Sequence, residues 1–389
     1  MYSKQWAATR LLTGLCAIIL TSAGCALSAT SSTSTGTVTP HATAGTLTPG
    51  GAGQPTATTG GGSGNGTPTP PLSTLTVYAG SGDGNFYAIN AASGQKRWQY
   101  PAASANKPIV SNGTVYFGTD GGFVYALNAG NLVWRFGPVG GIAGRPAFES
   151  GVVVVGADDG NIYGLDAGSG VQKWKVTTGG SVTSGAASTN GVAYVGSTDS
   201  QLYAINVSNG QIAWKYNTGS AIEWATPAVS NGVVYVGNDG GQLHAVNAGN
   251  GQRKWMFQTG GQILSRALIA NGVVSIGSVD HNLYGINESS GSQKWKYSAG
   301  DTVGTPVLVG SVLVGEATNG VIFGLDSSSG AFKWKFTTSG ATRPWLAAAQ
   351  NLVYSGSSDG HVFALNAASG STAWAFTGGG YFSSPAAGQ

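Results

Sequence analysis

From residue 75 onward, short apolar runs alternate with clusters of glycine, asparagine, aspartate and serine. In one stretch the runs are VVYVG at 233–237, QLHAVN at 242–247 and RKWMF at 253–257. Alternation with a period of two residues predicts β-strands, whose successive side chains point to opposite faces of a sheet. The turn residues between the runs predict antiparallel hairpins, and Asn-Gly pairs such as 231–232 are typical of the tightest ones.

The pattern recurs eight times, and each repeat ends with a tryptophan. Neighbouring tryptophans of this series lie 36 to 41 residues apart. A period near 40 with four short strands per repeat predicts an all-β fold, an eight-bladed β-propeller of four-stranded antiparallel blades. A linear solenoid is the alternative, but it would need capping repeats, and the sequence contains none. The repeat tryptophans are Trp98, Trp134, Trp174, Trp214, Trp255, Trp295, Trp334 and Trp374.

The two ends of the repeat array predict how the ring closes. The first repeat begins at residue 75 without an innermost strand, and the last residues, SSPAA at 383–387, match that missing strand. We therefore expect the C-terminal strand to pair with the first blade. Closure of this kind removes the exposed strand edges that an open array would leave.

Composition narrows the classes of function. Charged residues make up only 8% of the chain, against about 25% in ordinary soluble domains. The net charge is +3 and the basic residues are scattered, so we expect no nucleic-acid binding. The cysteines are Cys16 and Cys25, which excludes disulfides, thiolate metal sites and a cysteine nucleophile from the repeat region.

The N-terminal residues predict export. An apolar stretch at 11–20 follows a basic start, is too short to span a bilayer, and leads through small residues to Cys25. Residues 1–24 resemble a bacterial lipoprotein signal peptide, although Ser22 stands where that family usually has Leu. The resemblance implies a lipid anchor on Cys25 and a location outside the cytoplasm, at the cell surface or in the periplasm. An ordinary signal peptide with an incidental cysteine is the alternative.

Residues 25–74 consist mainly of Ser, Thr, Gly, Pro and Ala, with no acidic residue. Such a segment cannot bury enough apolar surface to fold, so it predicts a disordered tether. A coil of about 50 residues spans roughly 40 Å, enough to hold a domain away from a membrane. The propeller is expected over residues 75–389.

The repeat carries a specific motif, for example Asp166-Ala-Gly-Ser-Gly-Val-Gln-Lys-Trp174. This motif resembles the tryptophan-docking motif of pyrroloquinoline quinone (PQQ)-type propellers, in which the tryptophan packs between adjacent blades. The second repeat departs from it with a shorter turn, Asn128-Ala-Gly-Asn-Leu-Val-Trp134. The signal, lipidated cysteine and eight repeats together resemble the propeller lipoproteins of the outer-membrane β-barrel assembly machinery, which implies a scaffolding role.

The sequence offers little catalytic chemistry. Enzymes of the PQQ type use the quinone, calcium and a catalytic aspartate, and many carry adjacent cysteines that are missing here. The repeat aspartates fall in equivalent turns of different blades, where Asp bonds its own backbone, and single carboxylates spread around a ring do not form a calcium site. We therefore expect neither PQQ nor calcium, and no enzyme. These aspartates are Asp83, Asp159, Asp199, Asp280 and Asp359.

One group of residues breaks the repeat, where the chain approaches each innermost strand at the mouth of the central channel. Aligned by eye, the residues at this position are Lys107, Arg145, Ser184, Thr226, Ser265, Thr305, Arg343 and Ser384. Ring closure places the three cations among them on one arc. The same loops carry Glu223, Trp224, Arg266, Asp301 and Trp345.

Because Trp and Arg are favoured anchors of interfaces, these mouth residues predict a recognition surface. A small anion bound in the mouth and ordinary solvated loops are the alternatives. The overall prediction is a monomeric, non-catalytic, membrane-tethered scaffold that binds proteins of the cell envelope. Two other hypotheses remain: a small PQQ-dependent quinoprotein dehydrogenase, and a carbohydrate- or cell-wall-binding module.

Overall fold

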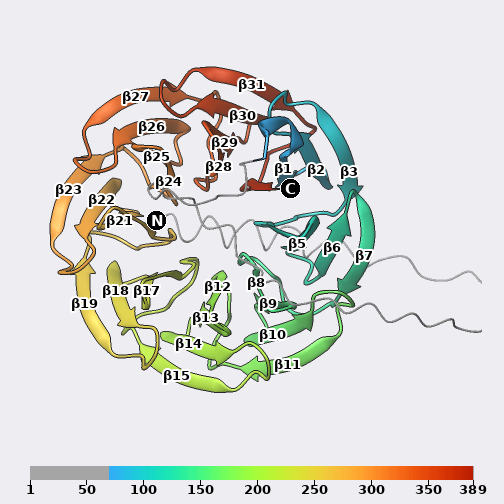
Figure 1. Ribbon diagram of the computed structural model, residues 1–389, viewed down its shortest axis with the longest axis vertical. Coiled ribbons are helices and arrows are strands. Elements are labelled where there is room, and N and C mark those ends of the chain that lie inside the picture. Colours follow the sequence, from blue (N-terminus) through green and yellow to red (C-terminus); the bar gives the residue numbers. More distant parts are fainter. Residues whose placement is uncertain (1–69, 389) are drawn as a thin grey trace, which may run out of the picture. The chain divides into compact units, whose positions relative to one another are not determined.

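The computed structural model describes residues 70–388, which form eight four-stranded antiparallel sheets around a central axis (Figure 1). The predicted eight-bladed propeller is therefore confirmed. The expected signal peptide at 1–24, Cys25 and residues 26–69 of the expected tether lie outside the described residues. Among residues 70–388 there is no helix long and apolar enough to cross a membrane.

Each blade runs outward from the axis through four strands, numbered here from blade one, which contains both ends of the described chain (Figure 1). The innermost strands are β32 (Ala386–Gly388), β4 (Ile109–Ser111), β8 (Ala147–Glu149), β12 (Ala186–Thr189), β16 (Ala228–Ser230), β20 (Leu268–Ala270), β24 (Val307–Val309) and β28 (Ala347–Ala349). The second strands are β1 (Thr76–Gly80), β5 (Thr114–Gly118), β9 (Val152–Gly156), β13 (Val192–Gly196), β17 (Val233–Gly237), β21 (Val273–Gly277), β25 (Val312–Glu316) and β29 (Leu352–Gly356). The third strands are β2 (Asn85–Asn90), β6 (Val124–Asn128), β10 (Asn161–Asp166), β14 (Gln201–Asn206), β18 (Gln242–Asn247), β22 (Asn282–Asn287), β26 (Val321–Asp326) and β30 (His361–Asn366). The outermost strands are β3 (Lys96–Pro101), β7 (Asn131–Phe136), β11 (Gln172–Thr177), β15 (Ile212–Asn217), β19 (Arg253–Gln258), β23 (Gln293–Ser298), β27 (Phe332–Thr337) and β31 (Thr372–Thr377).

The C-terminal strand closes the ring, as the sequence predicts. Strand β32 pairs antiparallel with β1, with Val77 opposite Ala387 and Tyr78 opposite Ala386. Just before it, the Ser383 hydroxyl accepts a hydrogen bond from the Gly80 backbone N–H. Blade one is thus built from the two ends of the described chain.

The repeat tryptophans lie on the outermost strands and pack against the next blade. The Trp134 indole is 7% exposed, and its Nε1 donates to the Ala167 carbonyl at 2.8 Å. Its ring face lies against Gly170, where an added Cβ would stand only 2.7 Å from the indole. The turn glycine therefore leaves the space that the docked indole fills, and burial of such large aromatics contributes strongly to stability.

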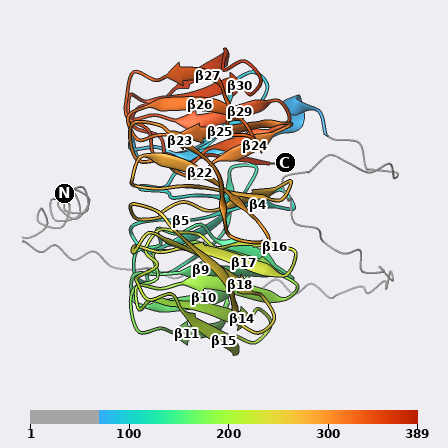
Figure 2. The same ribbon diagram turned by 90° about the vertical axis from the view of Figure 1, so that its left-hand side faces the viewer.

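The two faces of the ring carry different connections (Figure 2). The hairpin turns between second and third strands and the loops from one blade to the next lie on one face, which holds the mouth residues. The other face carries the remaining hairpin turns and a short 3-10 helix, η1 (Leu72–Thr74). There Gln350, in the turn between β28 and β29, donates to the Pro70 carbonyl at 2.6 Å. Residue 70 therefore joins the propeller on the face opposite the mouth.

Candidate functional site

Three of the expected mouth residues meet across the channel. The Lys107 Nζ lies 3.3 Å from the centre of the Trp345 ring and 5.9 Å from that of Trp224. These side chains come from the loops that precede blades two, eight and five. Two indoles that belong to no repeat position therefore hold one ammonium group, and cation–π attraction is strongest with tryptophan.

Further cations surround this cluster. Burial, followed by repulsion from Arg343 and Arg145, lowers the pKa of Lys107 to about 7. Burial, followed by repulsion from Arg266, lowers the pKa of Arg145 to about 10. Arg266 belongs to the loop before blade six, so the cations are distributed around the channel and are not confined to one arc. Their mutual repulsion shows that the mouth concentrates positive charge.

Three of these four cations have no acidic partner within residues 70–388. In that part of the chain, no carboxylate forms an ion pair with Lys107, Arg145 or Arg266. Burial and the charge of Glu223 raise the pKa of Asp239 to about 6, so these two acids lie together. Asp301 accepts a hydrogen bond from the neighbouring Thr302 N–H at 2.7 Å. The described mouth residues therefore form a cationic and aromatic site, and their acidic side chains do not pair with Lys107, Arg145 or Arg266.

The structure corrects the alignment of the mouth position. The Ser184 and Ser265 hydroxyls both bond the repeat glycine twelve residues further on, Gly196 and Gly277. Lys107, Arg145, Arg266 and Trp345 instead lie eleven residues before their repeat glycines. Arg266 is therefore equivalent to Lys107 and Arg145, whereas Arg343 lies two residues earlier. The loops enter the inner strands at different points, and the spacing between successive tryptophans does not reveal this difference.

One residue that sequence reasoning missed supports the loop that carries Arg343 and Trp345. Strand register places Glu316 opposite Ile322, the position of the repeat glycine in the other blades. Glu316 is fully buried and accepts a hydrogen bond from the Ser355 hydroxyl, and its Oε2 lacks a partner among residues 70–388. Burial raises the pKa of Glu316 to about 8, although the hydrogen bond from Ser355 and the nearby Thr342 hydroxyl and Trp345 backbone N–H oppose the shift. A glutamate at a repeat-glycine position was the sequence signal for this residue.

The repeat aspartates lie in local turns, as expected. Asp199 accepts hydrogen bonds from the Gln201 N–H at 2.9 Å, the Tyr203 hydroxyl and the Gly179 N–H of the preceding loop. Burial lowers the pKa of His244, which replaces the repeat tyrosine, to about 4, and the Tyr216 hydroxyl contacts its Nδ1 at 3.0 Å. Within residues 70–388, no three His, Cys, Asp or Glu side chains gather in a way that could hold a metal ion.

Comparison with protein families identifies one match. A family model described as "Outer membrane protein assembly factor BamB" matches residues 105–223, 220–304 and 302–383. These segments together span more than two thirds of the chain and include blades two to eight. No protein with a curated description matches the chain.

Solved structures share the architecture at low sequence identity. The crystal structure of BamB from Moraxella catarrhalis is 17% identical with a TM-score of 0.63, and the match covers 72% of this chain and 89% of that one. The computationally designed Ika8 protein is 19% identical with a TM-score of 0.67, over 75% and 93% of the chains. Dihydro-heme d1 dehydrogenase NirN in complex with DHE is 13% identical with a TM-score of 0.70, over 82% and 76%. At these identities the likeness concerns the fold.

Proposed function

This chain belongs to the family described as outer membrane protein assembly factor BamB, and we propose that it is a non-catalytic scaffold of the cell envelope that binds other proteins. The family match and the propeller fold support this proposal.

The proposal includes export and anchoring. The N-terminal sequence favours a cleaved signal at 1–24, a lipidated Cys25 and a tether over residues 25–74. Residue 70 joins the face opposite the mouth, so the described start of the chain leaves the mouth uncovered.

The mouth face is the proposed contact surface, and its partner is a protein segment rich in carboxylates. The observation that carries this proposal is the contact of Lys107 with Trp345 and Trp224 near several arginines. Among residues 70–388 no carboxylate forms an ion pair with Lys107, Arg145 or Arg266. Binding of an anion among cations that repel one another is favourable, because the anion offsets their repulsion. Trp and Arg side chains, which are half-buried here, are also among the residues that most often anchor interfaces.

In-cell crosslinking of the tagged full-length protein, followed by mass spectrometry, tests the scaffold role. The test variant combines Lys107→Gln, Arg145→Gln and Arg343→Gln. The matched control combines Lys175→Gln, Lys296→Gln and Lys335→Gln, three exposed lysines on β11, β23 and β27. A specific envelope partner that disappears in the test variant and persists in the control is the expected result. A partner retained by both variants would contradict the mouth as its binding surface, and no specific partner would contradict the scaffold.

A further inference from the structure

The tryptophan contacts between blades follow one rule at six of the eight boundaries. The indole Nε1 donates to the backbone carbonyl of the residue that follows the Asn or Asp of the next blade's outer turn, as in Trp134 to Ala167. The backbone N–H of that same residue donates to the carbonyl of the residue just before the second strand of its own blade, as from Ala167 to Gly151 at 2.9 Å. The backbone of one residue thus forms two hydrogen bonds: its carbonyl accepts from the indole of the preceding blade, and its N–H donates to a carbonyl of its own blade. The acceptors at these six boundaries are Ala167, Val207, Ala248, Glu288, Ala367 and Ala91.

Two boundaries break this rule. Between blades six and seven the Ser327 N–H still donates to the Ser311 carbonyl at 3.0 Å, but the buried Trp295 Nε1 has no acceptor among residues 70–388. Between blades one and two the turn itself is shorter. The outer turn of blade two has only Ala129 and Gly130 between β6 and β7, both with positive φ, where blade one has five residues between β2 and β3. Gly130 still lies against the ring of Trp98, where an added Cβ would stand 3.0 Å from Cγ. No residue in the described range accepts a hydrogen bond from Trp98 Nε1, and the bond to the Gly113 carbonyl, equivalent to that from Ala167 to Gly151, is also missing there.

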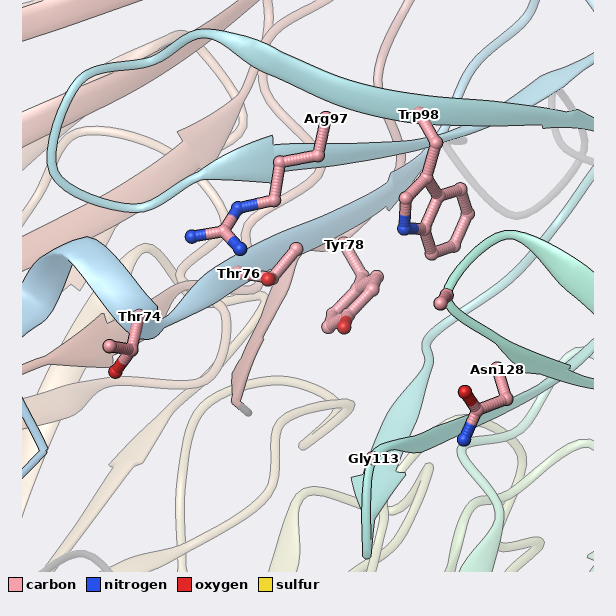
Figure 3. A pocket seen from close by; sticks show the side chains of 8 residues that line it. Thr74, Thr76, Tyr78, Arg97, Trp98, Gly113 and Asn128 are labelled. Carbon is pink, nitrogen blue, oxygen red and sulfur yellow. The ribbon is translucent and has the colours of Figure 1, made fainter.

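A pocket of about 560 Å³ occupies the place of the missing residue (Figure 3). Its lining includes Trp98, Tyr78, Gly113, Asn128 and Ala129. Tyr78 is 6% exposed, and at the next boundary the equivalent Tyr116 hydroxyl donates to the same carbonyl as the tryptophan, that of Ala167, at 3.3 Å. The short turn therefore leaves two donors and one carbonyl arranged around an open space.

We propose that this pocket binds a peptide turn supplied by another protein. The carbonyl of one small residue in that turn accepts from Trp98 Nε1 and the Tyr78 hydroxyl, and its N–H donates to the Gly113 carbonyl. A small side chain fits because Ala167, Val207, Ala91 and Ala367 fill the equivalent places and are buried there. The site is on the face opposite the mouth, and it is independent of the proposed function of the mouth.

The same geometry disfavours other ligands. The face of the Trp98 ring is covered by Gly130, so a sugar has no exposed indole face to stack on. Arg97, the cation of the lining, already donates to the Ser73 carbonyl at 2.6 Å and to the Leu75 carbonyl at 3.2 Å. Trp98 Nε1, the Tyr78 hydroxyl and the Gly113 carbonyl are the groups whose equivalents pair with one backbone residue at the next boundary.

The test follows the indole ¹H–¹⁵N resonances of the full-length protein as the peptide acetyl-Asn-Ala-Ala-Ser-Gly-amide is added. This is the sequence of the chain's own turn at 90–94. The control peptide has proline at the first alanine, which removes the N–H that would reach Gly113. We expect a saturable downfield shift confined to Trp98 with the first peptide and none with the second.

Three variants of the protein complete the test. Inserting Ala-Ser between Ala129 and Gly130 restores the repeat turn, so it should fill the pocket, shift the Trp98 resonance without peptide and abolish binding. Tyr78→Phe should weaken binding by about 5- to 10-fold, the usual effect of one hydrogen bond, whereas Tyr116→Phe, at a filled boundary, should leave it unchanged. No Trp98 shift at roughly 10 mM peptide, or binding retained after the insertion, would overturn the proposal.

Discussion

Lys107 and Trp345 touch at the channel mouth, although 237 residues separate them in the chain, with Nζ 3.3 Å from the ring centre. They precede blades two and eight, the two neighbours of blade one, which is completed by β32. The site therefore depends on ring closure: the C-terminal strand holds the two halves of the cluster at their observed separation.

Removing β32 should weaken both the fold and the mouth. A chain that ends at Ser383 loses the pairing of Ala386 and Ala387 with β1 and leaves the edge of that strand unpaired. We expect a cooperative thermal transition several degrees lower than that of the full chain, measured by circular dichroism. Addition of a peptide with the sequence of residues 384–389 should restore part of the loss. An unchanged transition would contradict closure by this strand.

Replacing Glu316 should remove a pH-dependent loss of stability. Its pKa in the folded protein, about 8, is above its ordinary value of 4.5, so the folded state holds a proton that the unfolded state releases. The free energy of unfolding should therefore fall as pH rises from about 4.5 to 8, by a few kcal/mol at most. Glu316→Gln should abolish this fall, so that its stability relative to the natural protein increases from pH 5 to pH 8. Denaturant unfolding across this range measures the difference, and a difference independent of pH would contradict a neutral buried Glu316.

Lys107 should show the opposite pH dependence. Its folded pKa, about 7, is below its ordinary 10.5, so between these values the unfolded state binds more protons. The destabilising effect of its charge is fully present below pH 7 and declines as pH rises toward 10. Lys107→Met should therefore gain least relative to the natural protein at high pH, whereas Lys175→Met on exposed β11 should show no such trend. A constant difference between pH 6 and 10 would contradict the lowered pKa.

A pair of tryptophan substitutions should separate an indole with an Nε1 hydrogen bond from one without it. Trp134→Phe removes the donor to the Ala167 carbonyl and leaves that buried acceptor without its indole partner. We expect it to lower the free energy of unfolding by about 1–2 kcal/mol more than Trp98→Phe, because Trp98 has no such bond to lose. Urea unfolding of the two variants gives the comparison. Equal losses would indicate that the boundary between blades one and two is docked like the others.

The sequence predicted the blade count and ring closure because the tryptophan period and the missing first strand are local features of the chain. It identified the residues of the mouth for the same reason: they interrupt a repeat. It did not predict that Lys107 stacks on Trp345, because that contact depends on ring radius and on how each loop enters its blade. The sequence alignment placed Arg343 at the position of Lys107 and Arg266 one residue away from it. The structure differs because the loops before the inner strands are not equally long. The short turn at Asn128 is visible in the sequence. The pocket beside Trp98 that it leaves could not be predicted, because it lies between that turn and the indole of the neighbouring blade.

The most direct test of the mouth as a site for acidic segments is calorimetric titration of the full-length protein with a hexaglutamate peptide. Hexaglutamine and citrate serve as the neutral and small-anion controls. The account predicts saturable binding of one hexaglutamate per propeller that weakens with salt, disappears in the Lys107/Arg145/Arg343→Gln variant and persists in the Lys175/Lys296/Lys335→Gln variant. Citrate binding without hexaglutamate binding would make the mouth a small-anion site. Equal hexaglutamate binding by the two triple variants would contradict the assignment of this surface.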